Sequence, residues 1–192
     1  MTTMFASRIS RRSLLKAAAF TITAGALSTA TAPFAKAEPG TIVGTVIDFA
    51  AGVPDAQAVK DGGFLGAVRY VSQRRPGAEW MLGKPVTRQE TDAMANLGLK
   101  TASVYQFGKE ETADWKQGAE GARVHAPQAI ELHRAAGGPT GRPIYVAIDD
   151  NPTREQYDNQ IRPYLQTFRT LLSDAGYSMG IYGNYNTINW AI

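Results

Sequence analysis

Short apolar runs alternate with longer amphipathic segments along the chain after residue 40. Each run is rich in β-branched or aromatic residues, which is typical of strands that are buried on both faces. The predicted strands span residues 41–49, 66–71, 101–106, 143–148 and 179–183. The segments between them space their apolar residues by three and four, as helices do, and end at glycines such as Gly98 and Gly176. This strict alternation predicts parallel strands joined by right-handed crossovers.

Five strand–helix units fit either an open, doubly wound sheet or part of a (β/α)8 barrel. The first turn reads Asp-Phe-Ala-Ala-Gly at residues 48–52, which does not match the Gly-rich phosphate loop of nucleotide-binding sheets. A complete barrel needs roughly 250 residues, and only 155 follow residue 37. We therefore expect residues 38–192 to form an α/β domain of the TIM-type (β/α) barrel class. The barrel is expected to be partial, with about five units and without its C-terminal strands.

Local signals predict how two of the helices begin or bend. Asn151 and Pro152 suit the cap and the first turn of the helix after the fourth strand. Thr87 and Glu90 have the spacing of a capping box. Pro163 is expected to bend the helix in which it lies.

The first 37 residues have the features of an export signal. Residues 10–16 read Ser-Arg-Arg-Ser-Leu-Leu-Lys, a mildly apolar stretch covers residues 17–30, and Ala-Lys-Ala follows at residues 35–37. The apolar stretch is too short and too polar to span a membrane permanently. We expect residues 1–37 to be a twin-arginine signal peptide that is cleaved near Ala37; the alternative is an amphipathic helix of the fold. The translocase of that route is then a partner during export.

The basic character of the chain belongs to this leader. The pI is about 9.2, but residues 1–37 carry five basic residues and no acid, and the rest carries 15 basic and 17 acidic residues. No nucleic-acid surface is therefore expected. The lack of cysteine excludes disulfides and thiolate chemistry. The two histidines, His125 and His133, are too few for a histidine-rich metal site and are expected at the surface, so no metal or cofactor is predicted.

Candidate catalytic carboxylates lie where two of the predicted strands end. Asp48 ends the first strand, and Asp149 and Asp150 end the fourth. Glycoside hydrolysis requires two carboxyl groups, of which one donates a proton and the other acts as nucleophile or base. Adjacent side chains on a strand point to opposite faces, so Asp149 and Asp150 share a face only if the strand has ended. We expect Asp149 to be the acid and Asp48 or Asp150 its partner; the alternative is that these residues only bind backbone groups.

Amide and aromatic side chains near the same strand ends are suited to the hydroxyls and apolar face of a sugar. The candidate substrate-binding residues are Arg69, Tyr70, Tyr105, Gln106, Tyr145, Tyr182 and Asn184. Two alternatives remain open at this point. Arg69 could form a structural ion pair, with Asp48 or Asp149 as its expected partner, and the tyrosines could belong to the core with one polar end exposed.

Several of these segments together resemble a known family. The matching segments are residues 44–54, 69–72, 80–85, 105–108 and 148–152. They resemble the glycoside-hydrolase-like domain of exported actinobacterial proteins, also known as DUF1906, and are similar at a distance to the lysozyme-like barrels of glycoside hydrolase family 25. The resemblance implies twin-arginine export, a TIM-type fold and a cell-envelope glycan such as peptidoglycan as substrate.

The chain departs from the family 25 pattern at the fourth strand. Those enzymes carry Asp-x-Glu there, whereas Asp149, Asp150 and Asn151 place an amide where the glutamate would be. The chain also lacks the further C-terminal strands of family members. Three interpretations therefore remain: an exported glycosidase, a binding module of the same fold that holds envelope carbohydrate without cleaving it, or a fragment that is inactive.

Overall fold

The computed structural model describes residues 41–192, so the predicted signal peptide lies outside the described residues. The strands are β1 (Ile47–Asp48), β2 (Gly66–Tyr70), β3 (Lys100–Tyr105), β4 (Pro143–Ile148) and β5 (Ser178–Gly183). The helices are α1 (Ala56–Asp61), α2 (Arg88–Asn96), α3 (Gly118–Ala135), α4 (Arg154–Gln156), α5 (Arg162–Asp174) and α6 (Tyr185–Ala191). Two 3-10 turns, η2 (Glu110–Thr112) and η3 (Asp114–Gln117), precede α3, and a π turn, η4 (Tyr157–Ile161), precedes α5.

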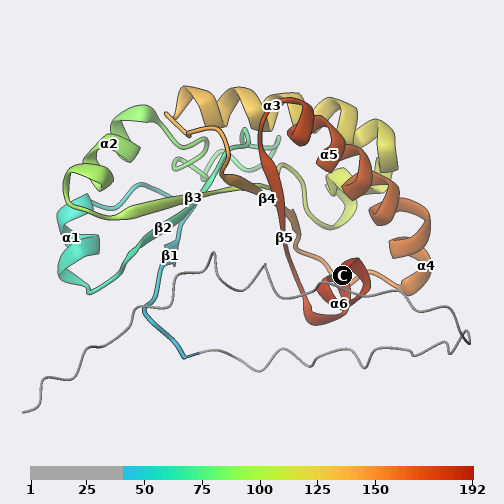
Figure 1. Cartoon of the computed structure of the whole chain (residues 1–192), viewed down its shortest axis with the longest axis horizontal. Coiled ribbons are helices and arrows are strands. Elements are labelled where there is room, and N and C mark those ends of the chain that lie inside the picture. Colours follow the sequence, from blue (N-terminus) through green and yellow to red (C-terminus); the bar gives the residue numbers. More distant parts are fainter. Residues whose placement is uncertain (1–40) are drawn as a thin grey trace, which may run out of the picture. The chain divides into compact units, whose positions relative to one another are not determined.

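The five strands form one parallel sheet in the order β1-β2-β3-β4-β5. This arrangement confirms the predicted parallel pairing of consecutive strands. The order contains no reversal, whereas a doubly wound sheet has one at its switch point. Helices α2, α3 and α5 accordingly lie along the same face of the sheet (Figure 1).

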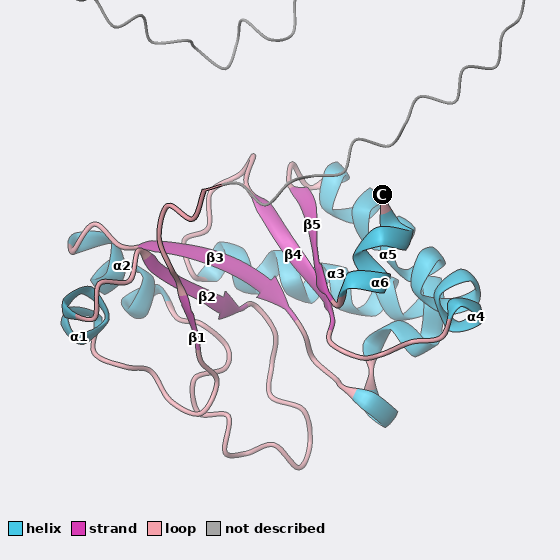
Figure 2. Cartoon of the chain, turned by 90° about the horizontal axis from the view of Figure 1, so that it is seen from below, coloured by secondary structure: helices cyan, strands magenta, loops and turns pink. Residues whose placement is uncertain are grey.

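The main core fills the space between the sheet and helices α3 and α5. On β4, Ile144, Val146 and Ile148 are fully buried in this core, because alternate side chains of a strand point to the same face. Tyr145 alternates with them along the strand and is partly exposed, so it lies on the opposite face of the sheet. Figure 2 views the sheet from that face, with the strands in front of helix α3. The face that is not covered by these helices therefore carries the odd-numbered residues of β4, and Asp149 continues that row.

The first strand is shorter than predicted. Only Ile47 and Asp48 pair with β2, whereas the apolar pattern predicted a strand over residues 41–49. Val43 and Val46 are exposed, so this part of the apolar run packs against no core.

Among residues 41–192, no helix combines the length and the apolar character needed to cross a bilayer.

Helix α2 begins at its predicted cap, but the second half of the predicted capping box is wrong. The side chain of Thr87 accepts a hydrogen bond from the Glu90 amide. The Glu90 side chain does not return this contact, since both its oxygens accept from Arg69 on β2. Glu90 therefore joins the helix to the sheet.

Helix α4 begins two residues later than predicted. Its cap is Thr153, and the Gln156 side chain completes a capping box with the Thr153 amide. Asn151 remains in the loop and is free to face the end of the sheet. Pro163 lies in the first turn of α5, where a proline is tolerated, and the π turn η4 ends two residues before it.

Candidate active site

Asp48 and Tyr70 lie next to each other at the carboxyl ends of β1 and β2. The Tyr70 hydroxyl donates a hydrogen bond of 2.9 Å to Asp48 Oδ2. Burial raises the pKa of Tyr70, and the negative charges of Asp48 and Asp149 and the neighbouring Tyr182 raise it further. The carboxyl ends of β1 and β2 thus place a carboxylate and a hydroxyl in direct contact.

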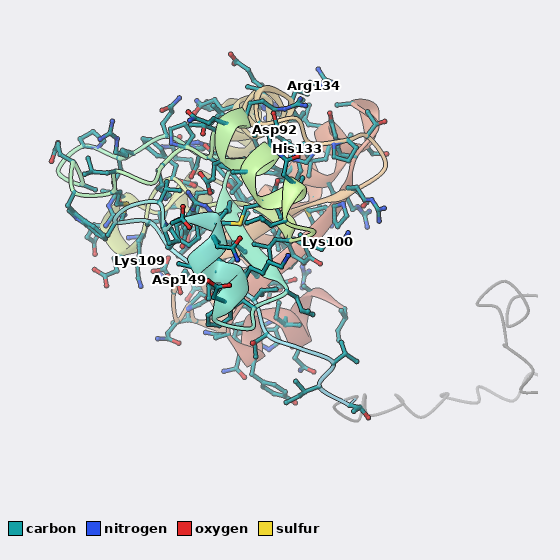
Figure 3. The ribbon with its side chains drawn as sticks, turned by 90° about the vertical axis from the view of Figure 1, so that its left-hand side faces the viewer. Asp92, Lys100, Lys109, His133, Arg134 and Asp149 are labelled. Carbon is teal, nitrogen blue, oxygen red and sulfur yellow. The ribbon has the colours of Figure 1, made fainter. Side chains whose placement is uncertain are left out.

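Asp149 is held by two donors that follow β3. Gln106 Nε2 donates to Asp149 Oδ2 over 3.3 Å, and Lys109 Nζ donates to the same oxygen over 3.1 Å. The Asp149 and Lys109 side chains are 40% and 41% exposed, which leaves both accessible to a ligand. Figure 3 shows the two residues together, well away from Lys100 and His133. Asp149 is therefore an accessible carboxylate with an ammonium group in contact.

A cavity of about 450 Å³ opens beside Asp149, at the ends of β4 and β5 and against the loop that follows β3. Its lining residues are Lys109, Glu110, Asp149, Asp150, Asn151, Tyr182, Gly183 and Asn184. Asp149 and Asp150 both reach it because β4 ends at Ile148, before the two aspartates. This cavity is the size of a small ligand site and is lined mainly by polar groups.

Asp150 shares the cavity but has a structural position. Its Oδ2 accepts from the Trp115 indole over 2.7 Å, and its Oδ1 accepts from the Glu110 amide over 3.0 Å. Trp115 is buried in the 3-10 turn η3, just before α3. Asp150 therefore anchors the loop between β3 and α3 beside Asp149.

Tyr182, near the end of β5, and Asn184, just after that strand, both line the cavity. Tyr182 is half exposed, which is suited to stacking on a sugar. Asn184 also caps α6, because its Oδ1 accepts from the Thr187 amide over 2.9 Å. Its Nδ2 donates to the Asn151 side chain over 3.0 Å, which connects the ends of β4 and β5.

The prediction that Arg69 contacts substrate is wrong. Its side chain is fully buried and points toward α2, where it pairs with Glu90 and not with Asp48 or Asp149. The guanidinium also donates to the Phe49 and Gly83 carbonyls and lies 3.9 Å from the centre of the Phe49 ring. The group has no accessible surface for a ligand, so its role is to join β1, the loop before α2 and α2 itself.

Tyr105 and Tyr145 are also not part of the cavity. Tyr105 is fully buried on the helix face, where its hydroxyl lies 2.6 Å from His125 Nδ1. Tyr145 is four residues before Asp149 on an extended strand, about 13 Å along the sheet, and its ring covers Gly180. Both positions are corrections to the sequence prediction, which placed every tyrosine near a strand end at the site.

The two histidines are buried, so the prediction that they lie at the surface is wrong. His125 lies between Tyr105 and Asp114, and burial lowers its pKa. His133 lies 2.8 Å from the Ser103 hydroxyl through Nδ1, and burial lowers its pKa as well. Both belong to the contact between β3 and α3. The sequence did contain a signal for this burial: alanines lie three or four residues before and after each histidine, on the same face of the helix.

Lys84, which the sequence did not single out, lies at the site. It is only 4% exposed, and its Nζ donates to the Gln106 carbonyl over 2.6 Å and lies 4.2 Å from the centre of the Tyr70 ring. Its position in the otherwise mainly apolar stretch of residues 80–86 was the available signal.

Among residues 41–192, no group of three or more His, Asp or Glu side chains is arranged to hold a metal ion.

Comparison with known proteins identifies the family. The model of the Rv2525c-like, glycoside hydrolase-like domain matches residues 57–192. This chain belongs to that glycoside hydrolase-like family. The family match confirms the resemblance that the sequence motifs indicated.

Relatives of this glycoside hydrolase-like chain agree in fold. The chain is 47% identical over 186 residues to "Putative peptidoglycan hydrolase Rv2525c" of Mycobacterium tuberculosis (strain ATCC 25618 / H37Rv), a match that covers 96% of this chain and 76% of the relative. A crystal structure of the M. tuberculosis Tat-secreted protein Rv2525c matches with a TM-score of 0.73 and 51% identity, over 77% of this chain and 72% of that one. The modular autolysin LytC of Streptococcus pneumoniae matches with a TM-score of 0.55 at 14% identity, over 76% of this chain and 33% of that one. The last match shows similarity of fold alone.

Proposed function

We propose that this chain is an exported glycosidase that cleaves a peptidoglycan-type glycan with Asp149 and Asp48. The observation that carries the proposal is that Asp48 and Asp149 lie at the carboxyl ends of β1 and β4 in one parallel sheet, with Asp149 lining the cavity and Asp48 held by Tyr70. Glycoside hydrolysis needs two carboxyl groups on either side of the scissile bond. The relative named as a peptidoglycan hydrolase supports the choice of substrate.

Asp149 and Asp48 have separate roles in this proposal. Asp149 protonates the glycosidic oxygen from the side of the cavity, and Asp48 acts as the nucleophile or base across the sugar ring. Tyr70 orients Asp48 through its hydrogen bond, and Gln106 orients Asp149. Asp150 keeps its contacts with Trp115 and Glu110 and supports the wall of the cavity.

The proposal also includes the finer fold and the route of export. The uninterrupted strand order supports an assignment of β1 to β5 as consecutive strands of a TIM-type barrel. The twin-arginine pattern at residues 10–16, together with the Tat-secreted relative, supports export with the translocase as a transient partner.

A second candidate function is carbohydrate binding without cleavage. Asn151 stands where family 25 enzymes have a glutamate, and it is fixed beside the cavity by Asn184. An amide in that place can donate and accept hydrogen bonds to sugar hydroxyls but cannot deliver a proton.

Assays of the purified full-length chain on cell-wall glycan separate the two functions. We expect the wild type to release soluble fragments, and Asp149→Asn and Asp48→Asn each to lower turnover by roughly 100-fold or more. The matched control is Asp158→Asn, which changes an aspartate of the π turn that pairs with arginines, and it should retain activity. If all four proteins bind the glycan equally and none cleaves it, the enzyme proposal fails and the binding function stands.

A further inference from the structure

The ammonium group of Lys84 is buried against two partners that carry no charge. One partner is the Gln106 carbonyl, 2.6 Å from Nζ, and the other is the Tyr70 ring. Burial of an ammonium group is costly unless its partners compensate. A methionine would fill a similar space without that cost, so the fold alone does not account for a lysine at this position.

Each of these partners connects Lys84 to one of the two aspartates. The Tyr70 hydroxyl donates to Asp48 over 2.9 Å. The Gln106 side chain donates to Asp149 over 3.3 Å. Lys84 is thus one residue removed from both carboxylates, although these lie at the ends of β1 and β4, which are not neighbours in the sheet.

The backbone around Lys84 is itself firmly placed. The Gly83 amide donates to the Ala50 carbonyl over 2.8 Å, and the Val86 amide donates to the Tyr70 carbonyl over 2.9 Å. A Cβ atom on Gly83 would lie only 3.0 Å from the Gly52 carbonyl oxygen, so this loop packs closely against the chain after β1. Lys84 therefore extends from a fixed point into the gap between the β2 and β3 ends.

We propose that Lys84 is a positioning residue of this active site, whose ammonium group holds Tyr70 and Gln106 and thereby fixes Asp48 relative to Asp149. The role rests on the proposed glycosidase function for its catalytic consequence. It differs from the roles of the aspartates because Lys84 is buried and acts through its two neighbours.

The charge of Lys84 gives this role a pH dependence. The charged groups that act on the ammonium are Asp48 on β1, Arg69 on β2, Arg75 in the following loop and Asp114 in η3. Burial is the largest cause that lowers the pKa of Lys84, to about 8, and Arg75 lowers it as well. The ammonium form is present below that pH and is lost as the pH rises through it, so the attraction to the Tyr70 ring and the Gln106 carbonyl weakens above about pH 8.

Two variants of the full-length chain test the role in turnover of a soluble peptidoglycan fragment. We expect Lys84→Met to lower kcat roughly 100-fold with little change in KM, because a misplacement of about 1 Å can cost that much. Lys84→Arg keeps the charge at every pH, so it should recover part of kcat and lose the decline above pH 8 that the wild type shows. Lys100→Met, at the exposed start of β3, is the control and should match the wild type. Equal pH profiles for wild type and Lys84→Arg would overturn the proposal.

A measurement that does not need activity separates this proposal from the glycosidase proposal. We expect the carboxyl 13C NMR signals of Asp48 and Asp149 both to shift in Lys84→Met, while that of Asp158 stays in place. Unchanged signals for Asp48 and Asp149 would contradict the positioning role of Lys84, even if the chain is an active enzyme. Shifted signals in a chain without activity would support the role and count against the glycosidase. If Lys84→Met does not fold, the same comparison is made with Lys84→Arg. The longer, planar guanidinium is expected to shift the signals of Asp48 and Asp149 as well.

Discussion

The ion pair between Arg69 and Glu90 offers a stability prediction that can be worked from the structure. The side chains are 0% and 4% exposed, so neither group is screened by water. Glu90→Ala removes both acceptor oxygens and leaves a buried guanidinium whose remaining partners are the Phe49 and Gly83 carbonyls. Loss of one partner of a buried pair costs about 3–5 kcal/mol, because the other charge stays buried without compensation.

A loss of this size is readily measured by thermal unfolding. For a chain of this length, 1 kcal/mol corresponds to roughly 2–4 °C in Tm, so we expect Glu90→Ala to lower Tm by about 10 °C. The matched control is Glu131→Ala on the exposed side of α3, which should stay within about 0.5 kcal/mol of the wild type. Equal Tm values for the two variants would refute the argument that Glu90 compensates a buried charge.

Three further changes test neighbouring parts of the structure. Trp115→Phe removes the indole donor to Asp150 and should cost about 1.5–3 kcal/mol in urea unfolding, as a hydrogen bond to a charged group does; a loss below 0.5 kcal/mol would contradict this. Tyr105→Phe leaves His125 Nδ1 without its partner and should cost about 1–3 kcal/mol with glycan turnover unchanged, whereas lost turnover would return Tyr105 to the site. Burial lowers the pKa of His133, so below about pH 6.5 the unfolded chain binds a proton that the folded chain does not, and stability falls as the pH falls. His133→Gln should make the urea midpoint less dependent on pH between 7.5 and 5.5, and an equal dependence would contradict the burial argument.

The sheet could be predicted from the sequence because its signal is local. The apolar runs at β2 and β4 are each bounded by glycine, proline or polar residues, and their strands begin at the predicted residues. The same rule failed for β1, where Val43 and Val46 continue the apolar pattern without a core to pack against. Periodicity reports that a residue is apolar, but it does not report whether another element covers it.

The position of Asp149 and Asp150 beside the cavity could also be predicted, because they follow a strand of a parallel sheet, whose carboxyl ends meet at one edge. The roles of their neighbours could not. Arg69 and Tyr70 are adjacent in sequence, yet one points to Glu90 on the helix face and the other to Asp48 on the open face. Which way Arg69 points depends on its contact with Glu90 of α2. The two residues are 21 positions apart, so no local sequence pattern predicts this contact.

The observed site differs from the predicted one most in the residues that come from loops. Lys84 and Lys109 both come from loops, after β2 and β3, and each places an ammonium group at a strand end. Their effects differ because of burial: Lys109 is accessible and can give way to a ligand at Asp149, whereas Lys84 is enclosed between Tyr70 and Gln106. In this chain the strand ends carry the carboxylates, and the loops place the ammonium groups around them.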